Sequence, residues 1–587
     1  MFLKKSIFKR NNKIYCHYKI VESYREDGKV KHRILFNVGT LSDEQAERLR
    51  ITLNAHNNPD IIVSKPEQIV VTKHAAYLDV AVLNHLWHEW HFHQFFSKDQ
   101  WVEALVINRC IDPKAKINIK DWMEKTVIPA YLGIDDPTKL DKFEVYRTLD
   151  RLHKSEGELQ TFLFHQIKNR WPHTENAFFY DITSSYLTGS RCVIAKLGYS
   201  RDHRPDCEQI VIALMITPEG YPFYWRVMPG NTQDITTIKP LIEDVKARFA
   251  LKNCTMVFDR GMVSTDNIVA LECEKWTYVS AMDRDEIKKA DFFNTALPES
   301  VTPDNYEQIM VMQEFLPFDE NAFLYYREFI IDDRRYILTF DVARFFDEHH
   351  AQLNNVAYFV QWLTVKNQSL REAKKKRCQS LLEREVAAML KRKHLKKWVS
   401  VNIEPYDFEV INKRGNSRTI QSFQLSYTIN TVAQKNEQRI HGITCFITNL
   451  DVTSHTAIDI IQWYRRKNKV EEAFHEIKDH LDLRPIYLTR EQRVMAHVII
   501  CVLAYFIFND IEYRLKQNDL AYSTEEVIGT LRECLVNRLA IQQTNRSWLS
   551  ITQPSSQLKE ILHALKCEVV IDKKRVEPVL KAAECWL

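Results

Sequence analysis

The stretch MVFDRG, residues 256–261, places an aspartate directly behind three apolar residues. Such a run is typical of a buried β-strand, and Asp259 stands where the strand ends. A carboxylate beside apolar groups is costly unless it is paired, hydrogen-bonded or bound to a cation. Asp259 therefore requires a partner elsewhere in the chain.

A second strand pattern ends in the same way, in NAFFYD, residues 176–181. Three strand patterns joined by short turns are followed by alternating helix and strand patterns, which predicts a mixed α/β fold with an RNase H-like sheet. The first and fourth strands of that sheet are neighbours. We therefore expect Asp181 and Asp259, which are 78 residues apart, to meet at one edge.

The 587 residues are too many for one compact core, and changes of pattern predict several units. The predicted segments are a small β domain (1–65), a helical region (66–172), the first part of the sheet core (173–282), a β-rich insertion with one basic helix (283–454), the second part of the core (455–515) and a helical C-terminal region (516–587).

The overall composition excludes few classes of function. The net charge of +4, from 81 basic and 77 acidic side chains, is too small to indicate a nucleic-acid partner by itself. The 12 cysteines include no CxxC pair, which predicts neither a zinc knuckle nor a disulfide framework and fits a reduced cytosolic compartment. The apolar stretch 494–508 contains His497 and predicts a buried helix, so no membrane partner is expected.

The distribution of charge is more informative than its sum. Residues 366–397 contain 12 lysines or arginines and three glutamates, a local net charge of +9. Such a segment is either a solvated helix or a surface that binds DNA phosphates by releasing counterions.

A long helix is predicted from near Thr453 to a residue before Pro485, and it offers Glu471 and Glu472 as a third acidic group. At 100° per residue, Glu471 borders the apolar stripe of this helix, whereas Glu472 falls near the far side. Helical spacing aligns Glu471 with Tyr464, Lys467, His475 and Lys478. Glu471 is therefore the better candidate to face a site.

The spacing of Tyr464, Lys467, Glu471 and Lys478 resembles the YREK signature of the DD(E) transposases of bacterial insertion sequences. FYDITSSYL (179–187) and VFDRGM (257–262) are similar to the family's blocks around its first and second catalytic aspartates, and the similarity extends over most of residues 175–510. The family usually has arginine at this position. Lys467 keeps the positive charge but lacks the bidentate contact with phosphate that an arginine offers.

The resemblance implies an RNase H-like catalytic core interrupted by the insertion, with Asp181, Asp259 and Glu471 as catalytic residues. These would hold two Mg²⁺ ions, for which Mn²⁺ can substitute, and in-line displacement at phosphorus would cleave and join DNA. The expected partners are double-stranded DNA, as terminal inverted repeats and target, and a second copy of the chain in a paired-end homodimer. The expected location is the bacterial cytoplasm, at the nucleoid when bound to DNA, with residues 66–172 as a DNA-binding region.

The same resemblance implies DNA contacts by Tyr464, Lys467 and Lys478 near the scissile bond. Arg260 is either a contact of this kind or an ion-pair partner of the acidic residues. In the basic segment the candidate DNA contacts are Lys374, Lys375, Lys376, Arg377, Lys391, Arg392 and Lys393.

Several alternatives remain open from the sequence. The aspartates at 181 and 259 could cap turns, and Asp202 and Asp206 could form a loop of ion pairs with Arg201 and Arg204 or serve as other ligands. As a whole, the chain could be an RNase H-like, metal-dependent nuclease without strand transfer, or a catalytically inactive DNA-binding derivative.

Overall fold

The computed structural model describes residues 1–10, 13–58, 63–141, 143–172, 177–251, 253–297, 301–320, 323–373, 375–411, 415, 417–542 and 545–587. The chain divides into two compact units. Unit 1 contains residues 1–85, 118–142 and 521–587, and unit 2 contains residues 86–117 and 143–520.

Unit 2 is built on a nine-stranded sheet in the order β10-β11-β12-β17-β9-β8-β5-β6-β7. Its RNase H-like part consists of β5 (Ala177–Tyr186), β6 (Gln209–Ile216), β7 (Pro222–Pro229), β8 (Thr255–Phe258) and β9 (Thr277–Ala281). β6 is antiparallel to β5 and β7, whereas β8 is parallel to β5 and β9. Every residue of β6 is buried, so both faces of this strand are covered. The predicted mixed α/β fold is confirmed.

The sheet continues beyond β9 into the segment predicted to be an insertion. Its further strands are β10 (Leu316–Pro317), β11 (Leu324–Ile331), β12 (Arg334–Asp341) and β17 (Ile443–Thr448). β17 pairs with β9 on the side opposite β8. Without β17, the backbone N–H and C=O groups on that side of β9 would be unpaired. The separate part of the insertion is therefore shorter than residues 283–454.

That separate part, which we call the arm, follows β12 and precedes β17. It comprises α14 (Val342–Arg371), α15 (Gln379–Arg392), β13 (Val399–Pro405), β14 (Phe408–Ile411), β15 (Ser417–Ile420), β16 (Phe423–Ile429) and α16 (Thr431–Gln438). Side chains from α14, α15 and β16, among them Phe359, Val386 and Leu425, share one buried apolar cluster. The arm thus has a core of its own.

Helices accompany the sheet of unit 2. Their bounds are α3 (Phe92–Phe95), α4 (Trp101–Ile111), α7 (Glu144–Leu152), α8 (Glu156–Arg170), α9 (Ile238–Phe249), α10 (Thr265–Cys273), α11 (Arg284–Lys289), α12 (Asp291–Ala296), α13 (Tyr306–Met312) and α19 (Glu491–Gln517). By length and composition α19 could cross a membrane, but 94% of its most apolar window is buried inside the protein. The sequence prediction of a buried helix is confirmed there.

The long helix predicted before Pro485 consists of three pieces. α17 (Ala457–Arg466) starts at Thr456, whose side chain forms a reciprocal capping box with Asp459. α18 (Asn468–His475) follows after Lys467, and a π-helical turn, η7 (Glu476–His480), ends the run. The wider turn changes the helical period, so side chains beyond His475 depart from the alignment expected for a regular helix.

Unit 1 contains two small sheets. β1 (Phe2–Arg10), β2 (Lys13–Glu26) and β3 (Lys29–Gly39) form an antiparallel sheet, and α1 (Asp43–Asn57) packs on β1. The second sheet has the order β19-β18-β4. Its strands are β4 (Ile69–Ala76), β18 (Leu535–Ile541) and β19 (Ser547–Ile551).

The second sheet corrects the prediction that residues 66–172 and 516–587 are helical throughout. β4 pairs with β18, so the two halves of this sheet come from opposite ends of the chain. Besides the helices already given, these regions contain α2 (Leu78–Glu89), whose last residues belong to unit 2, α5 (Ile119–Met123), α6 (Ile128–Tyr131), α20 (Thr524–Leu531), α21 (Ser556–Leu565) and α22 (Lys573–Ala583). β4 has no pairing partner nearby in the sequence, whereas β18 and β19 form a hairpin that the sequence pattern did not reveal.

Candidate active site

Two parallel strands bring the first two acidic residues together. β5 and β8 pair in a register that sets Tyr180 opposite Phe258. The next residue on each strand is Asp181 or Asp259, so the two aspartates are neighbours at the end of β8. Asp259 then precedes the short helical turn Arg260–Met262 as its N-cap residue, without a side-chain capping hydrogen bond. Asp181 continues in β5 opposite Leu214 of β6.

The environment of Asp181 disfavours its charged form. Burial raises the pKa of its carboxyl group to about 6, and the negative charges of Asp259 and Glu471 act in the same direction. The positive charge of Lys467 opposes this rise. Three carboxylates thus interact with one another and with a single ammonium group.

Lys467 lies among these carboxylates. Its side chain is 4% exposed, and its Nζ donates a hydrogen bond of 2.6 Å to Glu471 Oε1 and lies 3.9 Å from Asp259 Oδ1. Burial lowers the pKa of Lys467, but the attraction of Asp181, Glu471 and Asp259 outweighs burial and raises it above the ordinary value. Lys467 is therefore the internal counter-ion of the acidic residues.

Glu471 joins the site from the first turn of α18. Its carboxylate is 57% exposed and is bound to Lys467, four residues earlier. Glu472 is also exposed, but its charge acts on Lys469. Lys467, which lies near both Asp259 and Glu471, therefore links Glu471 to the pair of aspartates.

Tyr464 holds the second aspartate. Its hydroxyl group donates a hydrogen bond of 3.0 Å to Asp259 Oδ1, and the ring contacts Phe446 of β17 with centroids 4.8 Å apart. Burial and then the charge of Asp259 raise the pKa of Tyr464, which keeps its proton on the donor. This bond restricts the orientation of the Asp259 carboxylate.

A pocket of about 370 Å³ opens beside Asp259 and Tyr464 and is lined by three arginines, Arg260, Arg284 and Arg344. Arg284 and Arg344 both bind Glu348, and Arg344 Nη1 also donates to Thr444 Oγ1 at 2.8 Å. The sequence singled out Arg260 alone. The sequence did offer one indication of Arg284. It follows β9, the strand next to β8, by three residues, so it could have been expected near Asp259.

Lys478, the last residue of the signature, has a different environment. It is 7% exposed, and its Nζ donates a 2.8 Å hydrogen bond to Asp202 Oδ1, which also binds Arg484. Burial lowers the pKa of Lys478 despite this partner. The π-helical turn η7 accounts for its departure from the face of Glu471.

The predicted ion pairs within the loop around Asp202 form only in part. Arg204 binds Asp206 at 2.8 Å, but Arg201 binds Asp234. Asp202, with a side chain 1% exposed, pairs with Lys478 and Arg484 from outside the loop. The sequence did not reveal these long-range partners.

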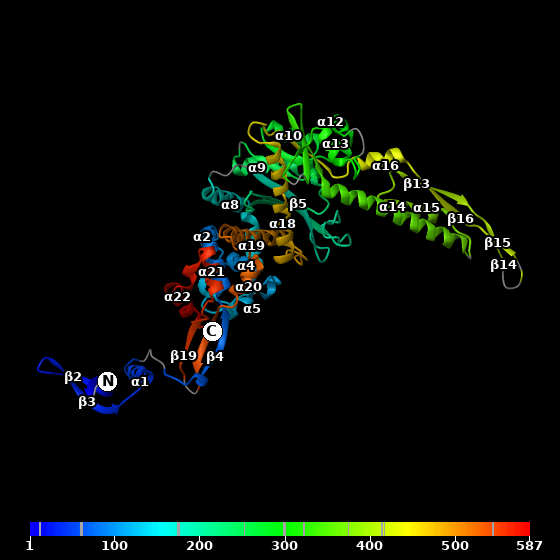
Figure 1. Cartoon of the computed structure of the whole chain (residues 1–587). Coiled ribbons are helices and arrows are strands. Elements are labelled where there is room, and N and C mark those ends of the chain that lie inside the picture. The colour runs from blue at the N-terminus through cyan, green and yellow to red at the C-terminus, as the bar shows by residue number, and fades with distance from the viewer. Residues whose placement is uncertain are drawn as a thin grey trace. The chain divides into compact units, whose positions relative to one another are not determined.

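The basic segment belongs to the arm (Figure 1). Lys375, Lys376 and Arg377 are exposed in the connection between α14 and α15, and Lys391 and Arg392 are exposed at the end of α15. Lys393 Nζ lies 3.9 Å from the centre of the Tyr358 ring. Lys374 lies outside the described residues.

The donor chemistry of the acidic residues suits a hard divalent cation, because all three side chains offer carboxylate oxygens. In the described part of the chain, however, no three or more His, Cys, Asp or Glu side chains are already arranged to hold a metal ion. Lys467 occupies the space among the carboxylates. A cation held by these carboxylates would therefore compete with Lys467 for Glu471 Oε1.

Two family models match the chain. The model described as transposase DDE domain matches residues 173–507, and the model described as IS1634 family transposase, N-terminal domain, matches residues 3–60. No curated protein matches the chain.

Among solved structures, the chain is similar to a piggyBac transposase synaptic complex with hairpin DNA, with 9% identity, a TM-score of 0.33, and coverage of 74% of this chain and 69% of that chain. It is also similar to the Mos1 transposase paired-end complex with left transposon end, with 10% identity, a TM-score of 0.14, and coverage of 41% and 67%.

Proposed function

The chain belongs to the DDE-domain transposases and is an insertion-sequence transposase, and we propose that Asp181, Asp259 and Glu471 are its catalytic residues. The observation that carries this proposal is the parallel pairing of β5 and β8, which makes Asp181 and Asp259 neighbours. Glu471 is joined to this pair through Lys467.

Transposases of this family generally depend on divalent metals. In our proposal the three carboxylates hold two Mg²⁺ ions, with Mn²⁺ as a substitute, and the ions supply activation of the attacking oxygen and stabilisation of the leaving oxygen. Asp181 must lose its proton to bind a cation, and its raised pKa makes this step dependent on pH near 6. Tyr464 fixes the orientation of Asp259 by its hydrogen bond.

The substrates we propose are the terminal inverted repeats of the element and a target duplex. Lys467, once released from Glu471, and Arg260 in the pocket beside Asp259 supply positive charge for phosphates near the scissile bond. Lys478 reaches DNA only if its bond to Asp202 opens. The exposed cations of the arm add sequence-independent affinity for the duplex.

Joining two ends in one event requires two active sites, so a homodimer holding paired ends is the proposed working form. The proposed location is the bacterial cytoplasm, at the nucleoid when the protein is bound to DNA. The N-terminal part of the chain is proposed to recognise the repeats.

The test is cleavage and strand transfer on a labelled duplex that carries the element's terminal repeat, with Mg²⁺. Glu471→Gln should abolish both products, and the adjacent control Glu472→Gln should retain them. Cleaved products without joined products would indicate a nuclease that lacks strand transfer. Equal activity of both variants, or activity in EDTA, would contradict the proposed catalytic residues.

A further inference from the structure

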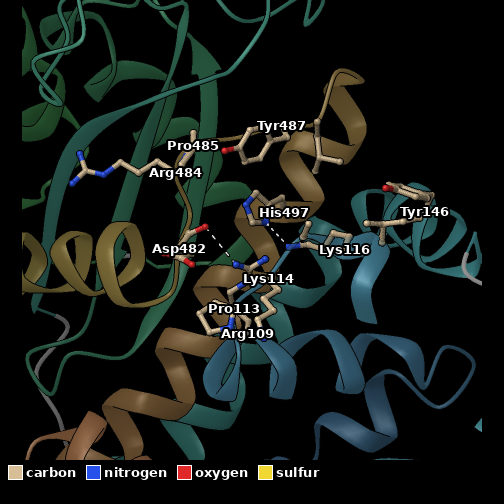
Figure 2. A pocket seen from close by; sticks show the side chains of 13 residues that line it. Arg109, Pro113, Lys114, Lys116, Tyr146, Asp482, Arg484, Pro485, Tyr487 and His497 are labelled. Carbon is tan, nitrogen blue, oxygen red and sulfur yellow. Dashed lines mark hydrogen bonds between the residues drawn. The ribbon is translucent and has the colours of Figure 1, made fainter. Parts of the chain in front are cut away.

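Unit 2 contains a pocket of about 310 Å³ that the proposed chemistry does not use (Figure 2). It lies between the end of α4, residues 113–117, and residues 482–488 ahead of α19. We call it the basic pocket, because four cationic side chains line it and Asp482 is the carboxylate among its lining residues. The cations are Arg109, Lys114, Lys116 and Arg484.

Two of these cations are buried and poorly satisfied. Arg109 is 4% exposed; its Nη1 donates to the carbonyl oxygens of Leu481 and Asp482 at 3.4 Å each, and its Nε is buried without an acceptor among the described residues. Lys116 is 8% exposed, and its Nζ lies 3.1 Å from His497 Nδ1, the contact drawn in Figure 2. Both groups retain capacity to donate to a further acceptor.

The charge of the basic pocket is not balanced from within. Lys114 binds Asp112 at 2.7 Å, and Arg484 binds Asp202 and Asp479. Arg109 and Lys116 therefore face Asp482 as the remaining carboxylate of the lining.

His497 adds no negative charge to the basic pocket. Burial and the neighbouring cations hold the pKa of His497 well below its usual range, so it is neutral. Burial and then the charge of Arg109 also hold the pKa of Lys116 well below its usual value. An anion bound in the pocket would favour the protonated form of Lys116 and would offset the cost of the buried Arg109 charge.

The basic pocket is connected to the strand that carries the first aspartate. Ile486 forms a parallel bridge with Leu187, and its carbonyl oxygen accepts a 2.9 Å hydrogen bond from the backbone N–H of Thr188. Leu187 follows Asp181 by six residues, which corresponds to about 20 Å along an extended strand. At about 3.4 Å per base pair, this distance corresponds to roughly six base pairs of a duplex.

We propose that the basic pocket binds a phosphate group of the DNA strand, about six base pairs from the scissile phosphate, with Arg109 and Lys116 as its ligands. This inference rests on the proposed function, which supplies the DNA. Guanidinium and ammonium groups together are suited to a phosphate. Tyr487 is 68% exposed at the rim, where an aromatic ring can pack on an adjoining sugar or base.

The inference is tested by binding of a labelled terminal-repeat duplex to the full chain in EDTA at several salt concentrations. Lys116→Met keeps the apolar stem and removes the ammonium group, so the slope of log affinity against log salt should become shallower by about 0.9, one phosphate contact. The control Lys239→Met removes an exposed lysine of α9, paired with Asp266, and should leave the slope unchanged. An unchanged slope in a folded Lys116→Met protein would overturn the inference.

Two further measurements keep the inference testable. Tyr487→Glu puts a negative charge at an exposed position, where folding is not at risk, and should weaken duplex binding about tenfold at low salt; unchanged affinity would contradict the inference. Inorganic phosphate should raise the melting temperature of the native protein more than that of Lys116→Met. Phosphate protection with an unchanged salt slope would mean a site for free phosphate only, and would also overturn the DNA assignment.

The binding assay needs no catalysis, so its result is separable from that of the proposed function. If the native protein shows no strand transfer but Lys116→Met makes the salt slope shallower, the proposed catalysis is rejected and the phosphate site in the basic pocket is supported. If strand transfer is intact but Lys116→Met leaves the salt slope unchanged, the phosphate site is rejected and the proposed catalysis is supported.

Discussion

Replacing Lys467 by methionine should make the stability of the protein depend more strongly on pH. In the native chain the Lys467 ammonium lies 2.6 Å from Glu471 Oε1 and 3.9 Å from Asp259 Oδ1, and its charge opposes the rise in the pKa of Asp181. Methionine fills similar space without charge. The variant therefore leaves three carboxylates together without their internal counter-ion.

The magnitude follows from the pKa of Asp181. Its rise from 3.8 to about 6 means that the folded state binds a proton more tightly than the unfolded state. Native stability therefore falls as pH rises from about 4 to 6, by up to about 3 kcal/mol at about 1.4 kcal/mol per pH unit. Without Lys467 the pKa rises further, so the loss continues above pH 6.

The expected cost of the substitution is below about 1 kcal/mol at pH 5, where Asp181 holds its proton and the Glu471 carboxylate, which is 57% exposed, is stabilised by water when it loses Lys467. At pH 8 it should reach about 2–3 kcal/mol, since a buried carboxylate has lost its charged partner. The variant should thus show a small loss of stability in acid and a larger one in base.

Melting temperatures in EDTA at pH 5 and pH 8 test this expectation. Lys469→Met is the matched control, because Lys469 lies two residues further along, in the first turn of α18, and donates to the Pro218 carbonyl oxygen at 2.8 Å. The control should lose a similar amount at both pH values. A Lys467→Met protein that is as stable as the native chain at pH 8 would refute the role of Lys467 as counter-ion.

Three other substitutions have definite expected outcomes. Tyr464→Phe removes the hydrogen bond to Asp259 and should slow cleavage about fivefold, at about 1 kcal/mol for the bond. A rate as low as that of an acidic-residue variant would contradict a positioning role. Gly198→Ala should lower the melting temperature markedly, because its Cβ would lie 2.1 Å from the Gly230 carbonyl oxygen. Gly529→Ala, in open space within α20, should instead stabilise the chain slightly, and a reversed order of these two melting temperatures would refute the packing argument.

The sequence was informative wherever a local pattern carried the information. Apolar runs ending in Asp181 and Asp259 predicted the two strands, and the RNase H-like order of the sheet is confirmed by the pairing of β5 with β8. Helical period favoured Glu471 over Glu472, and the geometry supports the first of these through Lys467.

Features that depend on distant contacts or local irregularity were not predictable. β4 and β18 are separated by most of the chain, so neither segment signals the other. The π-helical turn η7 breaks the regular period that aligned Lys478 with Glu471, and Asp202 emerged as its partner only from the tertiary structure. The same holds for the burial of Arg109 and Lys116 and for the missing acceptor of Arg109 Nε, which are visible only in the tertiary structure.

The most direct measurement of the central claim exchanges the ligand chemistry of one acidic residue. Asp259→Cys replaces a carboxylate by a thiolate, a softer ligand that suits Mn²⁺ better than Mg²⁺. If Asp259 holds a catalytic metal, this variant should fail to cleave the terminal-repeat duplex in Mg²⁺ and regain cleavage in Mn²⁺, whereas Asp259→Ala should stay inactive in both. Equal activity of Asp259→Cys and Asp259→Ala in Mn²⁺ would contradict metal binding at this residue.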